Sequence, residues 1–226
     1  MIYDMFAYYY DQMMADIDYD IFLDLVLKYI PKDKYILDAG CGTGIITMAL
    51  KKMGYQISGL DISNDMLMIL RHKMDMENVY FPLYENDLCD ELPKNSFGAV
   101  ISFLDVINYI IDYKKALRNI YDSLIPGGIF IFDISTVNYF KELIGYTEDD
   151  DYDDFSYHWE IEAGKEENSV VHRLAIKNKH GKVFIENHYQ KTYDDQVYLD
   201  YLKSLGFRVI KETGFDNLKT FFICYK

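Results

Sequence analysis

The sequence predicts an α/β protein built on a Rossmann-like, mostly parallel seven-stranded sheet with helices on both faces, plus a small antiparallel β insert. Two observations lead to this expectation. Between residues 35 and 133, short apolar runs alternate with helical patterns, and such alternation requires crossover connections between parallel strands. After residue 133, strand-like runs follow one another through turn sequences, which indicates antiparallel hairpins.

The alternating region is divided by residues that end or begin helices. Pro31 ends the first helical pattern, Gly54 is typical of a helix C-terminus, and Ser63 can cap a helix N-terminus. Pro126 and the two glycines after it end a further helix. In chain order we expect helix 21–30, strand 35–38, helix 45–53, strand 56–60, helix 63–73, strands 79–84 and 98–103, helix 113–124 and strand 129–133.

The region after residue 133 contains two turn sequences, 164–168 and 178–181. They separate three expected strands, and a helix and two more strands then restore the main pattern. The expected elements are strands 157–163, 169–177 and 182–193, helix 195–205 and strands 208–213 and 219–225. We therefore expect a main domain made of residues 1–139 and 194–226, with residues 140–193 as an antiparallel insert.

The charge of the chain is negative and unevenly distributed. There are 37 acidic and 23 basic residues among 226, which gives a formal net charge of -14 at pH 7. Such a chain repels phosphate backbones, so no nucleic-acid partner is expected. Residues 1–24 and 148–154 each hold six acids and no lysine or arginine, so most of the excess belongs to these two acidic segments.

No membrane span, secretory signal or metal site is expected. The longest stretch without a charged side chain, residues 39–50, contains three glycines and is far shorter than the roughly 20 apolar residues of a span. The first residues lack a basic segment followed by an apolar core, so we expect a cytoplasmic protein. Cys41, Cys89 and Cys224 are far apart and lack a neighbouring histidine, which excludes a disulfide framework or a zinc knuckle. A monomer and a homodimer both remain open.

The sequence Asp-Ala-Gly-Cys-Gly-Thr-Gly at residues 38–44 follows the first expected strand, at the sheet edge where open α/β folds bind ligands. A dinucleotide site of the form G-x-G-x-x-G needs a third glycine where this chain has Ile45, and the lysine of a P-loop is also missing. Asp61 ends the second strand, where a carboxylate accepts both hydroxyls of a ribose and repels a ribose phosphate. The pattern favours an unphosphorylated nucleoside with a small charged tail.

Residues 37–44 resemble the first motif of the class I S-adenosylmethionine-dependent methyltransferases residue for residue, and the resemblance extends over nearly the whole chain. It implies S-adenosyl-L-methionine as cofactor and S-adenosyl-L-homocysteine as product. It implies that Gly40 and its neighbours (Asp38, Cys41, Gly42, Gly44) contact the methionyl end and that Asp61 contacts the ribose. It also implies Ile62 and Met66 at the adenine face, Asp87 and the Leu88 amide at the adenine edge, and Phe103 beside the sulfonium. The bacterial branch described next implies that Tyr10, or more weakly Tyr3, bonds the methionyl carboxylate.

A closer resemblance is to a bacterial branch that acts on small molecules, and it rests on residues 6–11, 105–109 and 186–193. Some members of this branch dimethylate amines on nucleotide-linked sugars. The branch implies a small-molecule acceptor, for example an amine, bound beneath the insert as a lid. It also implies that the two acidic segments cover the mouth of the site, where they would attract a cation. The candidate acceptor-binding residues are Asp105, Asn108, Tyr109 and His188.

Plainer interpretations of several residues stay open. The glycine loop could be a tight turn without a ligand, Tyr10 a half-buried tyrosine of an amphipathic helix, and Asp105 a helix cap. Cys41 has no evident histidine partner, so it is not expected to act as a nucleophile. Several polar residues alternate along the insert strands and form either a metal or base cluster or a solvated polar face. They are His158, Glu160, His172, Glu186 and His188.

The expected reaction is methyl transfer to a nitrogen or oxygen atom of a small acceptor. Its driving force resides in the cofactor, so the protein must mainly align the reactants. An amine must only arrive unprotonated, whereas a hydroxyl needs a general base, which the sequence does not declare. Residues 102–105 also differ from the Asp/Asn-Pro-Pro-aromatic clamp of family members that methylate adenine or glutamine amides. A cofactor-binding regulator without transfer activity and, less favoured, a nicotinamide-dependent oxidoreductase remain as alternatives.

Overall fold

Seven strands form the main sheet of the computed structural model, which describes residues 6–214 and 217–226. They are β1 (Tyr35–Ala39), β2 (Gln56–Asp61), β3 (Leu83–Glu85), β4 (Phe97–Ser102), β5 (Leu124–Ser135), β10 (Arg208–Gly214) and β11 (Lys219–Tyr225). Their order is β10-β11-β5-β4-β1-β2-β3, and β1 to β5 pair in parallel. The last strand pairs antiparallel with both β5 and β10. The mostly parallel seven-stranded sheet predicted from the sequence is confirmed.

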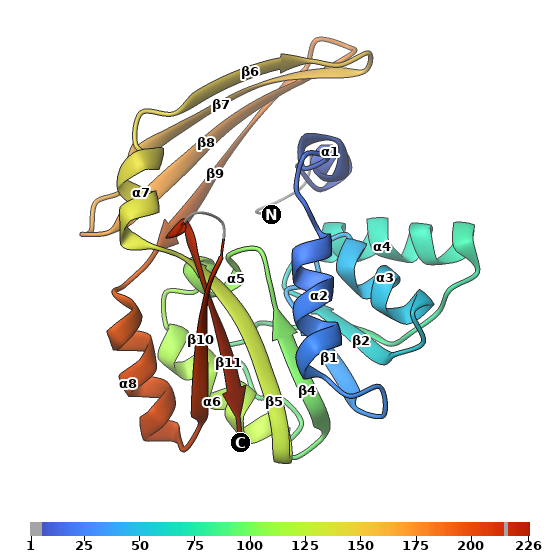
Figure 1. Ribbon diagram of the computed structural model, residues 1–226. Coiled ribbons are helices and arrows are strands. Elements are labelled where there is room, and N and C mark those ends of the chain that lie inside the picture. The colour runs from blue at the N-terminus through green and yellow to red at the C-terminus, as the bar shows by residue number, and fades with distance from the viewer. Residues whose placement is uncertain (1–5, 215–216) are drawn as a thin grey trace.

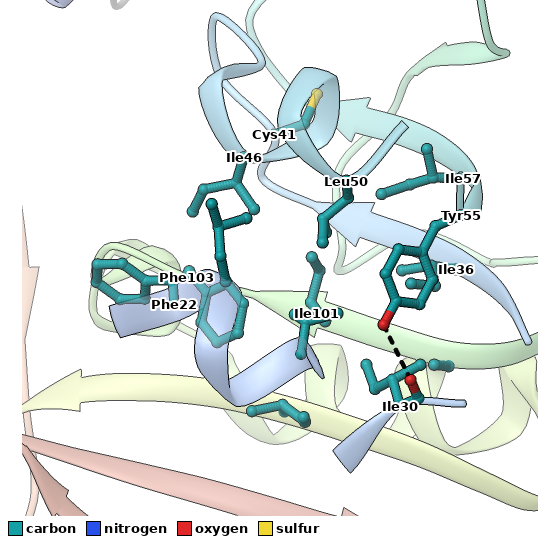
Figure 2. Packing of buried hydrophobic residues seen from close by; sticks show 14 of the residues in the cluster. Phe22, Ile30, Ile36, Cys41, Ile46, Leu50, Tyr55, Ile57, Ile101 and Phe103 are labelled. Carbon is teal, nitrogen blue, oxygen red and sulfur yellow. Dashed lines mark hydrogen bonds between the residues drawn. The ribbon is translucent and has the colours of Figure 1, made fainter. Parts of the chain in front are cut away.

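Helices cover both faces of this sheet (Figure 1). On one face, α2 (Asp20–Tyr29), α3 (Ile45–Lys52) and α4 (Asn64–Glu77) pack on the sheet through a cluster that includes Phe22, Leu50 and Ile101. Figure 2 shows this cluster, in which the Tyr55 hydroxyl donates a hydrogen bond to the Ile30 carbonyl at 3.1 Å. On the other face, α6 (Tyr113–Ser123) and α8 (Asp195–Leu205) pack on the sheet through a second cluster.

A second sheet lies above the first and has four antiparallel strands in the order β6-β7-β8-β9. These strands are β6 (Thr147–Asp151), β7 (Phe155–Ala163), β8 (Ser169–Asn178) and β9 (Val183–Lys191). Helix α7 (Val137–Leu143) leads into this insert sheet, and α1 (Phe6–Met13) lies beneath it (Figure 1). Tyr9 of α1 stacks on Phe155 at a centroid distance of 4.0 Å, and both belong to a cluster that also contains Met66. Helix α1 therefore joins the insert sheet to the main domain.

Several elements differ from the expectation. The third strand was expected over 79–84, but β3 begins at Leu83 and ends at Glu85. Pro82 has no N–H to donate to the sheet, and the Val79 N–H still bonds the Met74 carbonyl behind α4. The short helices α5 (Val106–Tyr109) and α7 and the strand β6 were not expected. In the described ranges of the chain, no helix has the length and apolar character needed to cross a bilayer.

Candidate active site

A cavity of about 640 Å³ lies at the carboxyl edge of the main sheet, between that sheet and β9 of the insert. Its volume falls within the range of small-molecule sites. Most of the residues expected from the sequence border it: Tyr10, Asp38, Gly40, Cys41, Gly42, Asp61, Ile62, Met66, Asp87, Leu88, Phe103, Tyr109 and His188. Three further residues expected at the site do not border the cavity: Gly44, Asp105 and Asn108. Tyr3 lies outside the described residues.

The three glycines of the loop have different surroundings. All three have positive φ angles, +85° for Gly40, +52° for Gly42 and +81° for Gly44. A Cβ at Gly40 would overlap Val106 of α5, and one at Gly44 would overlap Leu70 of α4. A Cβ at Gly42 would meet no atom within 4 Å. Gly40 and Gly44 therefore permit close packing of the loop, whereas Gly42 leaves open space in which a ligand can approach the backbone.

Two carboxylates of the main domain are held by the loop and the helix that follows it. The Gly42 N–H donates to Asp61 Oδ2 at 2.7 Å, and the Ser63 N–H donates to Asp61 Oδ1 at 2.9 Å. Each oxygen of an ionised carboxylate accepts about two hydrogen bonds, so Asp61 can still accept both hydroxyls of a ribose. The Thr47 hydroxyl donates to Asp38 Oδ2 at 2.5 Å, and burial raises the pKa of Asp38 to about 7.

The adenine end of the expected site is also organised. Asp87 Oδ1 accepts the Cys89 N–H at 2.8 Å, and the Asn119 amide donates to the Leu88 carbonyl at 2.9 Å, so the backbone that would face an adenine edge is fixed. Ile62, 55% exposed, and Met66, 5% exposed, border the same cavity as apolar side chains. A carboxylate beside two apolar side chains fits a flat base with an exocyclic amino group.

The first helix closes one side of the cavity and carries a residue that sequence reasoning missed. The Thr43 hydroxyl donates to Asp11 Oδ1 at 2.5 Å, and Lys73 of α4 forms an ion pair with the same carboxylate. Asp11 therefore ties α1 to the glycine loop, and the match at residues 6–11 was the signal that could have found it. Burial raises the pKa of the neighbouring Tyr10 well above its ordinary value, so its phenol keeps its proton and can donate.

Cys41 borders the cavity but has the chemistry of a packing residue. Its side chain is buried, and burial raises the pKa of its thiol well above the ordinary value. A thiol that keeps its proton is neither a nucleophile nor a metal ligand. Across the described ranges, no group of three or more histidine, cysteine or acidic side chains is arranged to hold a metal ion.

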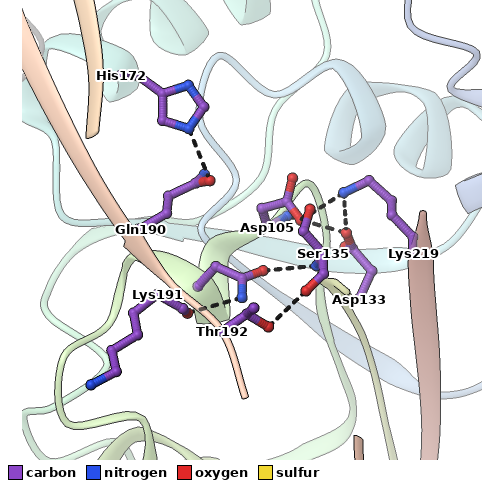
Figure 3. A network of polar contacts seen from close by, with 9 residues as sticks. Asp105, Asp133, Ser135, His172, Gln190, Lys191, Thr192 and Lys219 are labelled. Carbon is purple, nitrogen blue, oxygen red and sulfur yellow. Dashed lines mark hydrogen bonds and ion pairs between the residues drawn. The ribbon is translucent and has the colours of Figure 1, made fainter. Parts of the chain in front are cut away.

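Two residues expected to bind the methyl acceptor, Asp105 and Asn108, instead fasten α5 in place. Figure 3 shows Asp105 beside Ser135 and Lys219. The Asn108 amide donates to the Lys191 carbonyl at 3.1 Å and accepts the Ser135 N–H at 3.0 Å. Asp105 accepts the Ser135 hydroxyl at 2.7 Å and pairs with Lys219 at 2.7 Å. Asp105 precedes α5, but its side chain makes no capping bond there. Both side chains join α5 to the end of β5, behind the cavity wall.

On the insert side, Asn187, His188 and Tyr189 of β9 all border the cavity, although the alternation of a regular strand predicted at most one of the last two. No residue of the acidic segment 148–154 borders the cavity, because β6 is the strand at the far edge of the sheet from β9. The segment instead packs against α1 through Tyr152. In that segment, Glu148 accepts hydrogen bonds from Tyr146 and Tyr157. The expectation that this segment rims the mouth is therefore not met.

A Rossmann-like sheet with this glycine loop, an acid ending β2, a second acid after β3 and a cavity between two sheets defines the class of S-adenosylmethionine-dependent methyltransferases. The comparisons agree. A family model described as a methyltransferase domain matches residues 37–132. A curated protein of Geobacillus sp. (strain WCH70), named as a methyltransferase, is 30% identical and the match covers 95% of this chain and 92% of that protein. This chain therefore belongs to the methyltransferase family.

Solved structures share the whole architecture, including the insert. An S-adenosylmethionine-dependent methyltransferase from Clostridium acetobutylicum ATCC 824 matches with a TM-score of 0.82 and 25% identity, covering 99% of this chain and 98% of that one. The sugar N-methyltransferase KedS8 from Streptoalloteichus sp ATCC 53650 matches with a TM-score of 0.80 and 19% identity, covering 100% and 93%. At that identity, the second match concerns the fold alone.

Proposed function

We propose that this protein transfers the methyl group of S-adenosyl-L-methionine to a nitrogen or oxygen atom of a small-molecule acceptor. The observation that carries the proposal is the composition of the cavity. One side consists of the glycine loop, Asp61 and Asp87, and the other side of Tyr109 and three residues of β9. Such a cavity can hold a nucleoside cofactor and a second molecule in contact with each other.

The chain's own residues supply binding and orientation. The backbone beside Gly42 would hold the charged methionyl end, the two oxygens of Asp61 the ribose, and Asp87 the adenine amino group. When bound, S-adenosyl-L-methionine supplies an activated methyl group on a sulfonium. The protein's contribution is to align an acceptor with that group and to exclude water, and α1 and the insert sheet cover the cavity for this purpose.

A small acceptor is favoured over a macromolecule. Residues 140–193 would act as a lid, because the cavity lies beneath β9. KedS8, which shares the fold, is named as a sugar N-methyltransferase. A long polymer would need an open groove to reach the same position. An amino sugar and a phenol both fit this proposal, since each is small and carries a suitable attacking atom.

The test is formation of S-adenosyl-L-homocysteine, measured by mass spectrometry, with a panel of amino sugars, nucleotide-linked amino sugars, aliphatic amines and phenols. We expect product with at least one class of acceptor. Asp61→Asn should weaken S-adenosyl-L-homocysteine binding by about tenfold or more, because hydrogen bonds to a charged carboxylate contribute about 1.5–3 kcal/mol. Tight cofactor binding without product on any acceptor would favour a regulator. Thermal stabilisation by NAD but not by S-adenosyl-L-methionine would favour an oxidoreductase.

A further inference from the structure

Two histidines face each other on the insert sheet. His172 of β8 is directly opposite His188 of β9 in the antiparallel register, and both are buried, with 9% and 4% exposure. Residues paired in this way lie close enough for the charge of one to affect the other. Their partners differ, and this difference separates their chemistry.

His172 is held in its neutral form. The Trp159 indole N–H, which can only donate, points to His172 Nδ1 at 3.2 Å, so Nδ1 carries no proton. The single proton therefore sits on Nε2, which donates to Gln190 Oε1 at 3.1 Å (Figure 3). Burial lowers the pKa of His172, which acts in the same direction. Both nitrogens are engaged, and His172 is not among the residues that border the cavity.

His188 has a different partner and position. Its Nε2 lies 3.4 Å from Glu186 Oε2, and the Glu186 side chain is only 10% exposed. Glu186 precedes His188 by two residues in β9, so both side chains lie on the same face of the strand. His188 also borders the cavity, edge-on to the Tyr109 ring at a centroid distance of 6.3 Å. A carboxylate in this position can stabilise the positive charge of the imidazole once the ring has accepted a proton.

The other groups around His188 do not compete for a proton. The titratable groups that face it are Glu186 on β9, His172 on β8 and Tyr109 on α5, with Asp105 acting on the last two from the start of α5. Burial raises the pKa of Tyr109, and the side chain of Gln190 bonds its phenol oxygen, so Tyr109 remains a donor. His172 is neutral with both nitrogens engaged.

We propose that His188 accepts the proton that the acceptor loses during methyl transfer, and that Glu186 stabilises the resulting imidazolium. This inference rests on the function proposed above. A lone pair of the attacking atom forms the new bond to the methyl carbon, and the carbon–sulfur bond breaks with its electrons remaining on sulfur. The proton of an O–H passes to His188 as the new bond forms. An ammonium nitrogen has no lone pair, so its proton passes to His188 before the attack. The acceptor is therefore a hydroxyl compound or an amine that arrives protonated.

The first test compares His188→Gln with His180→Gln, which changes an exposed histidine in the turn between β8 and β9. With the panel member that gives most S-adenosyl-L-homocysteine, we expect His188→Gln to lower kcat about 100-fold, the lower range of general-base contributions, and His180→Gln to leave it unchanged. Glu186→Gln should lower kcat by a smaller factor without changing KM for S-adenosyl-L-methionine. Unchanged kcat in His188→Gln, with calorimetry showing normal S-adenosyl-L-homocysteine binding, would overturn the proposal.

The second test needs no acceptor. Diethyl pyrocarbonate acylates unprotonated imidazole nitrogens, and peptide mapping by mass spectrometry locates the modified histidines. We expect fast acylation of exposed His180 and slower acylation of His188, whose ring borders the cavity but whose two nitrogens are buried. His172 should be spared, because both its nitrogens are hydrogen-bonded. Acylation of His180 without His188 would contradict a proton-accepting role for His188. If no panel member yields product, the proposed function fails, while this chemical result still decides the role of His188.

Discussion

At the scale of single residues, the glycine loop separates a packing requirement from a binding requirement. Ala at Gly40 would place a methyl group against Val106 at a positive φ, so we expect Gly40→Ala to lower the free energy of unfolding by about 2–4 kcal/mol. Ala at Gly42 meets no neighbour, so its cost should be about 1 kcal/mol. Its methyl group would instead enter the ligand space and weaken S-adenosyl-L-homocysteine binding about tenfold. Urea denaturation and calorimetry on both variants measure the contrast, and equal stability losses would refute it.

Asp38 gives a pH dependence with a defined sign. Its pKa is about 7 in the folded protein against an ordinary value of 3.8, because burial disfavours the charge. The folded state therefore binds this proton more tightly than the unfolded chain, and the contribution of Asp38 to stability falls as pH rises from about 4 to 7. Asp38→Asn removes that loss, so the stability of the variant relative to the parent should increase by up to about 4 kcal/mol across this window.

Denaturant unfolding between pH 4.5 and 8 measures the Asp38 effect. Asp33→Asn, which changes an exposed acid before the same strand, is the matched control and should show no such trend. A constant stability difference between Asp38→Asn and the parent over the whole range would mean that the carboxyl group does not hold a proton in the folded state.

At the scale of elements, helix α1 depends on one carboxylate for its connection to the glycine loop. Asp11→Asn removes the ion pair with Lys73 and weakens the hydrogen bond from Thr43. We expect faster amide hydrogen exchange over residues 6–13, because the remaining contacts of α1 are chiefly those of one small apolar cluster. Asp16→Asn makes the same charge change at an exposed position just after the helix and should leave exchange unchanged. Equal exchange in all three proteins would show that the tie does not hold α1.

The elements also show where sequence patterns succeed. The strands and helices of the main domain have apolar patterns and clear end signals, and Ser63 caps α4 by accepting the Met66 N–H at 3.2 Å, as its position predicted. Strand β6 could not be predicted, because its sequence of one threonine and four acids has low strand propensity. Pairing with β7 makes it a strand, and its exposed charges suit an edge position.

At the scale of the whole molecule, the cavity is assembled from distant parts of the chain. Its borders come from α1, the loop after β1, the ends of β2 and β4, and β9. The residues on the side of the glycine loop were predictable as neighbours, since the loop, Asp61 and Asp87 each follow a strand at the same edge of the sheet. The positions of Asp105 and Asn108 were not, because their partners Ser135, Lys191 and Lys219 approach them only through the topology of the sheet.

Lys219 connects the C-terminal hairpin to the wall of this cavity. Its ammonium lies 2.7 Å from both Asp105 and Asp133, and the Asp133 side chain is fully buried. Lys219→Met would leave two acids uncompensated, and breaking a buried pair costs about 3–5 kcal/mol at neutral pH. Burial already raises the pKa of Asp133 and Lys219 opposes that rise, so in the variant the Asp133 carboxyl group would take up a proton at higher pH.

The stability loss in Lys219→Met should therefore be greatest at pH 7 to 8 and should shrink as the pH falls, because protonation removes the uncompensated charge. Lys211→Met is the matched control, since Lys211 pairs with Asp195 at 2.9 Å with a side chain that is 42% exposed. An exposed pair of that kind contributes about 0–1 kcal/mol, and its loss should depend little on pH. Urea denaturation of both variants and the parent from pH 5 to 8 measures these differences. If both substitutions lowered the stability equally at every pH, the ion pairs of Lys219 with Asp105 and Asp133 would not be what fastens the hairpin to α5. The cavity wall would then depend on apolar packing alone.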